Sequence, residues 1–101
     1  MRVIVFFDLP TETSTDRRNY RKFRRFLVKG GFMMIQESVY AKLALNSTQV
    51  SQIINDVKSA QPEKGLVQIL SVTEKQFSKM EIVSGKCSSN VVDSDERLLI
   101  L

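Results

Sequence analysis

An aspartate and a run of arginines lie close together near the start of the chain, in the stretch FFDLPTETSTDRR of residues 6 to 18. Asp8 ends an apolar segment, and a proline follows two residues later. This acid can close a strand, because Asp accepts backbone hydrogen bonds in turns and proline stops a strand ladder. It can also supply an oxygen ligand to Mg²⁺, which tolerates a shell made mostly of water. Two such carboxylates, one from each of two chains, would hold the ion better than one.

Basic residues crowd into one short segment. Seven of the 15 lie within thirteen positions, and no acid occurs between Arg17 and Gln36. Five of the seven are arginines, whose planar guanidinium suits phosphate oxygens. The segment therefore predicts a phosphate-binding surface, with an ordinary solvated helix face as the alternative. The seven are Arg17, Arg18, Arg21, Lys22, Arg24, Arg25 and Lys29, and the candidate nucleic-acid-binding residues among them are Arg17, Arg18, Arg21, Lys22 and Arg25.

The composition excludes several classes of site. With Cys87 as the single cysteine and no histidine, the chain has no disulfide framework, no Cys/His zinc site and no histidine acid or base. A reducing cytoplasm is the expected compartment. The N-terminal apolar run is too short for a signal segment or a membrane span. A length of 101 residues with a net charge of +4 predicts one compact, mildly basic domain.

The first two elements must position Asp8 and the arginines. Residues 2 to 7 are β-branched and aromatic without polar alternation, which predicts a central strand covered on both faces. A helix is expected over about residues 15 to 29, with Thr13 or Ser14 as N-cap and two glycines as the stop. Its apolar residues fall on one arc and its seven basic residues on the opposite one. The apolar arc consists of Tyr20, Phe23, Phe26 and Leu27.

The rest of the chain completes a recognisable order of elements. Two extended segments, FMMIQ and SVYAKLA, join tightly near Gln36 and Glu37, and a second amphipathic helix follows a capping box begun by Asn46. Apolar strands are expected at residues 65 to 72 and 80 to 85. The order is β-α-β-β-α-β plus an extra strand, which predicts an α+β, ferredoxin-like fold with an antiparallel sheet and both helices on one face.

The end of the chain differs in composition from residues 1 to 85, which form the predicted ferredoxin-like domain. Residues 86 to 96 are polar, which predicts a linker, whereas the last residues, RLLIL, are too apolar to stay in water. We expect residues 96 to 101 to form an additional C-terminal strand that joins a partner's sheet. Such an exchange makes a homodimer.

Three motifs in this order, VFFD, DRRNYRKFRRFLVKGGF and QESVY, give the chain a family resemblance. Residues 1 to about 85 resemble the CRISPR-associated protein two family, the small ferredoxin-like dimeric subunit of the spacer-acquisition machinery. The drawn-out loop after Asp8 is similar to that of type II variants. The resemblance implies a homodimer, an integrase subunit as partner, and double-stranded DNA or RNA as ligand.

The resemblance also implies roles for three residues. Asp8 corresponds to the family aspartate, which faces its partner's copy near the dimer twofold and is the proposed catalytic ligand for Mg²⁺, with Mn²⁺ as an alternative. Arg17 and Arg18 correspond to the family's phosphate contacts at the start of the first helix. The chain departs from the pattern at Phe7, where many relatives carry tyrosine, so no hydroxyl acts there.

These observations support two functions of different classes. In the first, a symmetric dimer holds duplex nucleic acid by its phosphates while an integrase subunit cuts and joins the ends. In the second, the Asp8 pair performs metal-dependent cleavage of phosphodiesters. With no histidine in the chain, and no lysine or glutamate placed as a general base, the sequence favours binding as the primary role and slow cleavage as the secondary one. A ferredoxin-like regulatory or nucleic-acid-binding module without catalysis is the third interpretation.

Overall fold

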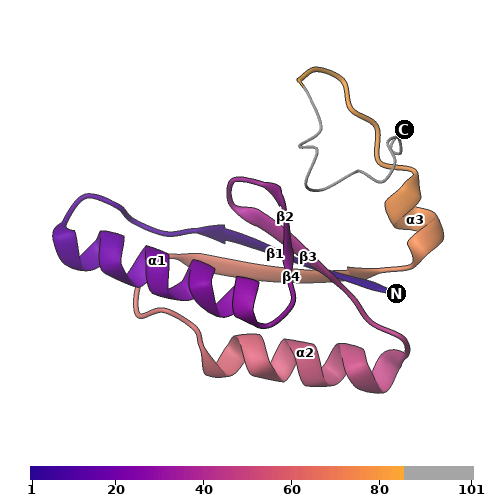
Figure 1. Ribbon diagram of the computed structural model, residues 1–101, viewed down its shortest axis with the longest axis horizontal. Helices are drawn as coiled ribbons and strands as arrows, with labels where there is room; N and C mark the ends of the chain where they lie inside the picture. The colour runs from indigo at the N-terminus through magenta and orange to yellow at the C-terminus, as the bar shows by residue number, and fades with distance from the viewer. Residues whose placement is uncertain (86–101) are drawn as a thin grey trace.

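A computed structural model of the chain describes residues 1–85 (Figure 1). The predicted order of strands and helices is confirmed as far as the fourth strand. The elements are β1 Arg2–Asp8, α1 Ser14–Lys29, β2 Met33–Gln36, β3 Val39–Leu43, α2 Ser47–Ser59, β4 Leu66–Val72 and α3 Glu74–Ser78. None of these helices combines the length and apolar character needed to cross a membrane. The predicted linker and strand at residues 86 to 101 lie outside the described residues.

The sheet is antiparallel, with strand order β2-β3-β1-β4, so β1 is central as predicted. Both long helices cover one face of this sheet (Figure 1). Alternate residues of β1 point into that layer, where Val3, Val5 and Phe7 pack in the core. The helices contribute the buried side chains Phe23 and Leu27 from α1 and Val50, Ile53 and Val57 from α2. This arrangement confirms the ferredoxin-like fold.

Helix α1 begins at a reciprocal capping box. The Thr13 hydroxyl accepts a hydrogen bond from the Asp16 amide at 3.0 Å, and the Asp16 carboxylate accepts one from the Thr13 amide at 3.3 Å. Of the two predicted N-caps, Thr13 is therefore the one used. At the other end, Lys42 Nζ donates to the Gly30 carbonyl at 2.6 Å. A cation is favourable there because the last carbonyls of a helix carry partial negative charge.

The second face of the sheet is covered by neither α1 nor α2. We call it the open face. By strand register it carries Ile4, Phe6 and Asp8 of β1 together with their neighbours Val39, Ala41 and Leu43 of β3 and Leu66, Gln68 and Leu70 of β4. Phe6 is 37% exposed and Leu70 is 51% exposed. The prediction that β1 is covered on both faces is therefore met at Ile4, which is 5% exposed, but not at Phe6.

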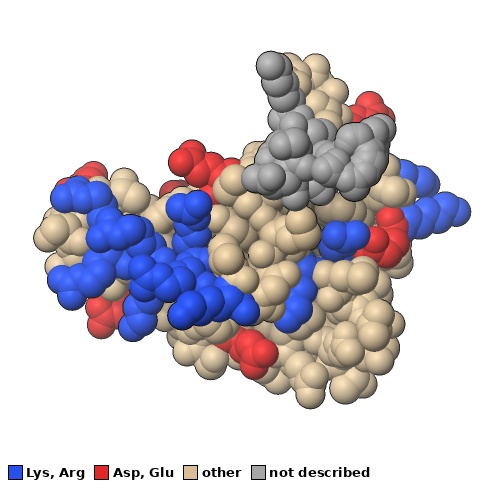
Figure 2. Space-filling view, viewed as in Figure 1, with Lys and Arg blue, Asp and Glu red and all other residues tan. Residues whose placement is uncertain are grey.

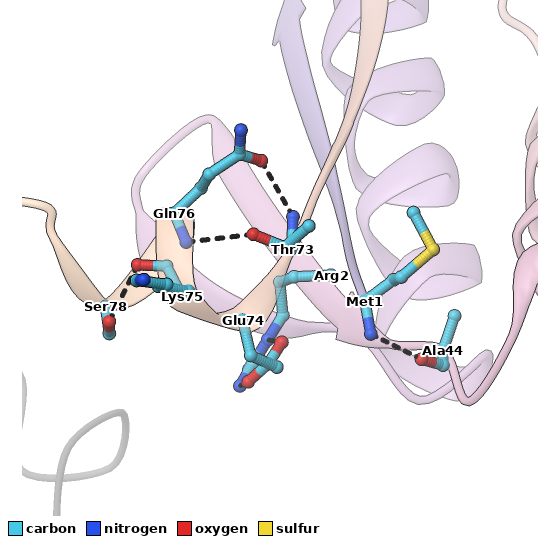
Figure 3. A network of polar contacts seen from close by, with 8 residues as sticks. All are labelled: Met1, Arg2, Ala44, Thr73, Glu74, Lys75, Gln76 and Ser78. Atoms are coloured by element: carbon cyan, nitrogen blue, oxygen red, sulfur yellow. Dashed lines mark hydrogen bonds and ion pairs between the residues drawn. The ribbon is translucent and has the colours of Figure 1, made fainter.

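The predicted strand at residues 80 to 85 is wrong. The chain instead forms α3 directly after β4, and residues 80 to 85 join no strand of the sheet. A capping box explains the turn: the Thr73 hydroxyl accepts from the Gln76 amide at 3.0 Å, and Gln76 Oε1 accepts from the Thr73 amide at 2.9 Å. These bonds start a helix in the segment between the two predicted late strands (Figure 3).

Candidate nucleic-acid interface and acidic site

Asp8 is the last residue of β1 and lies opposite Leu66 of β4. Because side chains alternate along a strand, Asp8 shares the open face with Phe6 and Ile4. Asp8 is exposed, and within residues 1–85 its carboxylate accepts no hydrogen bond and forms no ion pair. A strand terminator of the usual kind would bond to nearby backbone amides. The exposed, unpaired carboxylate leaves its oxygens available to a ligand.

Residues 1–85 of a single chain do not supply a complete metal site at Asp8. Among residues 1–85 no three Asp, Glu, Cys or His side chains group together as metal ligands. Mg²⁺ keeps most of its water shell and is often bound through one or two carboxylates. Asp8 alone would hold the ion weakly, and a second carboxylate, such as Asp8 of a second copy, would complete a two-carboxylate donor set.

The loop between Asp8 and α1 is held at both ends. Leu9 is 8% exposed and belongs to the core. Arg17 reaches back from the first turn of α1, and its Nη1 donates to the carbonyls of Thr11 at 3.1 Å and Glu12 at 3.0 Å. Arg17 thus fastens the loop, which the sequence did not indicate.

Five cations form one stripe along α1. At about 100° per residue they fall within an arc of about 100°, and they extend over roughly 16 Å of helix. All five are exposed, and within the described residues none makes a side-chain hydrogen bond or ion pair. The cluster is the blue patch over α1 in Figure 2. We call these residues, Arg18, Arg21, Lys22, Arg25 and Lys29, the α1 stripe.

Arg17 and Arg24 lie apart from the α1 stripe, although the sequence placed all seven cations on one arc. Both lie on the flank of α1 nearer to its apolar arc. Arg24 Nε donates to the hydroxyl of Tyr40 at 2.9 Å, and Tyr40 is 1% exposed. Two of the predicted cations are therefore tied to the protein itself. Of the predicted binding residues, Arg18, Arg21, Lys22 and Arg25 lie together on the stripe, and Arg17 lies outside it.

Comparison with known proteins gives consistent matches. The family model described as CRISPR associated protein Cas2 matches residues 1–80. A CRISPR-associated endoribonuclease Cas2 from Treponema denticola is 50% identical over 101 residues, which is the full length of both chains. One from Streptococcus mutans is 46% identical and covers 100% of this chain and 93% of its own.

Solved structures agree on the fold. The crystal structure of Streptococcus pyogenes Cas2 at pH 6.5 superposes with a TM-score of 0.62 at 20% identity, over 83% of this chain and 100% of the other. A second Cas2 crystal structure gives a TM-score of 0.61 at 24% identity, over 91% of this chain and 94% of the other.

Proposed function

Because the chain belongs to the CRISPR-associated protein Cas2 family, we propose that it is a nucleic-acid-binding subunit of CRISPR adaptation that holds a duplex by its phosphates. The α1 stripe is the observation that carries this function. Its five exposed cations have no internal partner within the described residues. Such groups can exchange their counterions for phosphates without breaking a bond inside the protein.

The proposed contacts recognise backbone and not base sequence. Arginine and lysine on an exposed helix reach phosphate oxygens along a strand, and such contacts fix position without reading bases. Three of the aromatic residues are used in the core, where Phe23 and Tyr40 each pack against Phe7, and the exposed Phe6 lies on the open face of the sheet and not on α1. Double-stranded DNA is therefore the proposed ligand, and double-stranded RNA offers the same phosphate chemistry.

A homodimer is part of the proposal, and the open face is the surface that supports it. Phe6, Leu66 and Leu70 are 37%, 56% and 51% exposed on this face, while Ile4 and Ala41 beside them are buried. Burying the exposed apolar side chains against a second copy is favourable because apolar area leaves water. Asp8 lies on the same face, so a twofold axis near the end of β1 would bring two copies of Asp8 together. The dimer then presents two α1 stripes to the duplex while the integrase subunit cuts and joins its ends.

Cleavage at the Asp8 pair is the second candidate function. The exposed Asp8, which has no partner within residues 1–85, supports it, as does the name endoribonuclease carried by relatives that are 50% and 46% identical. A Mg²⁺ or Mn²⁺ ion held there would activate water and neutralise developing charge on a phosphodiester. The protein would contribute the two carboxylates and the α1 stripes that hold the scissile strand. With no histidine in the chain, this reaction is proposed to be slow.

Duplex affinity of matched charge variants tests the binding function. Arg21→Gln/Arg25→Gln removes two cations of the α1 stripe, and Lys58→Gln/Lys64→Gln removes two exposed cations outside it. Fluorescence anisotropy with two duplexes of equal length and unrelated sequence should show weaker binding by the first variant, equally for both duplexes, and near-normal binding by the second. Equal losses in the two variants would mean that net charge and not the stripe holds the duplex.

A further inference from the structure

Gly65 lies directly against the backbone that presents Asp8. It has φ of +97° and immediately precedes β4, whose first residue pairs with Asp8. A Cβ built on Gly65 would lie 2.7 Å from the Asp8 carbonyl oxygen, 2.7 Å from Leu9 Cδ2 and 3.0 Å from Leu9 Cα. Real Cβ atoms do not come this close to other heavy atoms, so a side chain at position 65 forces something to move.

The groups in contact with Gly65 have little freedom to yield. Two of the three atoms belong to the backbone, and the third is on Leu9, which is 8% exposed and packed in the core. Downstream of Leu9, the loop carbonyls of Thr11 and Glu12 are held by Arg17. The remaining way to relieve the contact is to separate the end of β1 from the start of β4, and Asp8 is the residue at that end.

We propose that Gly65 is a positioning residue for Asp8. Because Gly65 has no side chain, the loop before β4 can contact the end of β1 closely, and this contact fixes the position of the Asp8 carboxylate. This inference rests on the proposed cleavage at the Asp8 pair. An ordinary Cβ contact begins at 3.4 Å and the built one is 2.7 Å, so a Cβ would displace the Asp8 backbone by up to about 0.7 Å. Catalytic and metal-binding side chains must be positioned within about 0.5 Å, and a displacement of about 1 Å lowers the reaction rate on the order of 100-fold.

Gly31 supplies a matched control. Its φ is +94°, almost the same as that of Gly65, so alanine at either position is forced to a positive φ that residues with a side chain rarely adopt. The nearest atom to a Cβ on Gly31 is Lys42 Cε at 3.4 Å, an ordinary contact with a flexible side chain. Gly31→Ala therefore measures the effect of a positive φ at alanine alone. Gly65→Ala measures that effect together with the steric displacement of the Asp8 backbone.

The test compares wild type, Gly65→Ala and Gly31→Ala as full chains, with three measurements. Mn²⁺ affinity is measured by electron paramagnetic resonance. The rate of cleavage of a short RNA is measured under single-turnover conditions, and duplex affinity is measured in EDTA by fluorescence anisotropy. We expect Gly65→Ala to lose at least about 10-fold in Mn²⁺ affinity and in cleavage rate while its duplex affinity stays within about twofold of wild type. Gly31→Ala should keep all three within about threefold. A mere loss of stability would not separate metal affinity from duplex affinity in this way.

Equal behaviour of the two alanine variants in Mn²⁺ affinity and rate overturns the role of Gly65 and leaves the cleavage proposal intact. A wild type that neither binds Mn²⁺ nor cleaves overturns cleavage at Asp8 and with it the role of Gly65. If Gly65→Ala fails to fold by circular dichroism, Leu9→Ala/Gly65→Ala is compared with Leu9→Ala, because this pair removes the contact with Leu9 Cδ2 and keeps the contact with the Asp8 oxygen. Failure to fold in both backgrounds also overturns the proposal, since Gly65 would then serve the fold as a whole.

Discussion

Arg2 and Glu74 form a two-pronged ion pair that joins β1 to the first turn of α3. Arg2 Nε donates to Glu74 Oε2 at 2.9 Å, and Arg2 Nη2 donates to Glu74 Oε1 at 2.6 Å (Figure 3). The Arg2 guanidinium carbon also lies 4.5 Å from the centre of the Phe77 ring. This pair fixes the direction in which the chain leaves β4.

The ion pair should make stability depend on acid pH. The hydrogen bond from Arg2 lowers the pKa of Glu74 below 4.5, although partial burial opposes the shift. The unfolded chain keeps the ordinary pKa, so the stabilisation is complete above that value and is lost as pH falls through the lower pKa of the folded state. For this half-exposed pair we expect about 0.5 to 1 kcal/mol at neutral pH.

Urea unfolding of wild type and Glu74→Gln at a series of pH values measures this dependence. The wild type should be more stable at pH 7, and the difference should shrink as the pH falls from about 5 to about 3. A difference that stays constant over that range would show that the Glu74 charge contributes nothing through Arg2.

Tyr40→Phe should cost about 0.5 to 1.5 kcal/mol of unfolding free energy, because it removes the acceptor of the Arg24 hydrogen bond and keeps the ring. The ring itself stacks on Phe7 with centroids 5.7 Å apart, a contact that the substitution preserves. Tyr20→Phe is the control, since the Tyr20 hydroxyl lies 3.5 Å from the Glu37 carbonyl oxygen and makes only a weak bond. Equal losses for the two variants in urea unfolding would contradict a specific contribution from Arg24.

Sequence patterns anticipated an element well where several local signals coincide. α1 combines a capping box at Thr13 and Asp16, an apolar period of 3.6 and a pair of terminal glycines, so its bounds were predicted within one or two residues. α3 has five residues, too few for a period to show. It is also tied to Arg2, which lies 72 positions from Glu74 in the sequence, and only the folded sheet brings the two together.

For the candidate site, the local features could be predicted from the sequence and the tertiary contacts could not. The apolar run of β1 placed Asp8 at a strand end, and the clustering of cations indicated a basic helix face. The separation of Arg17 and Arg24 from the α1 stripe could not be inferred, because it depends on how α1 packs against the loop and against Tyr40. The contact of Gly65 with Asp8 likewise follows from the pairing of β1 with β4, and no sequence pattern predicts it.

Leu70→Glu should weaken or abolish the proposed homodimer, because it places a charge in the middle of the open face. Leu70 is 51% exposed in the single chain and lies opposite Ile4 of the central strand. Val28→Glu on α1 is the control, since Val28 is 54% exposed and lies on the helical side of the fold. Sedimentation velocity at several concentrations distinguishes the variants. A Leu70→Glu protein that remains as tight a dimer as Val28→Glu would place the interface elsewhere.

Asp8→Asn should separate the two interpretations of this acid. Facing carboxylates repel when no cation lies between them, so the substitution should slightly stabilise the metal-free dimer and remove the stabilisation gained from Mg²⁺. Thermal melts of both proteins with and without Mg²⁺ measure the effect, and duplex affinity in EDTA should be unchanged or higher. If both proteins gain the same few degrees from Mg²⁺, or neither gains any, Asp8 is a strand terminator only.

The salt dependence of duplex binding tests the central claim most directly, because it counts the phosphates that the α1 stripe neutralises. The slope of log affinity against log salt changes by about 0.9 for each phosphate that the protein ceases to neutralise. Arg21→Gln/Arg25→Gln should therefore flatten the slope by up to about 1.8 per chain relative to wild type, while Lys58→Gln/Lys64→Gln, with the same change in net charge, should leave it unaltered. A stripe variant with the wild-type slope, or two double variants with equal slopes, would contradict phosphate binding along α1.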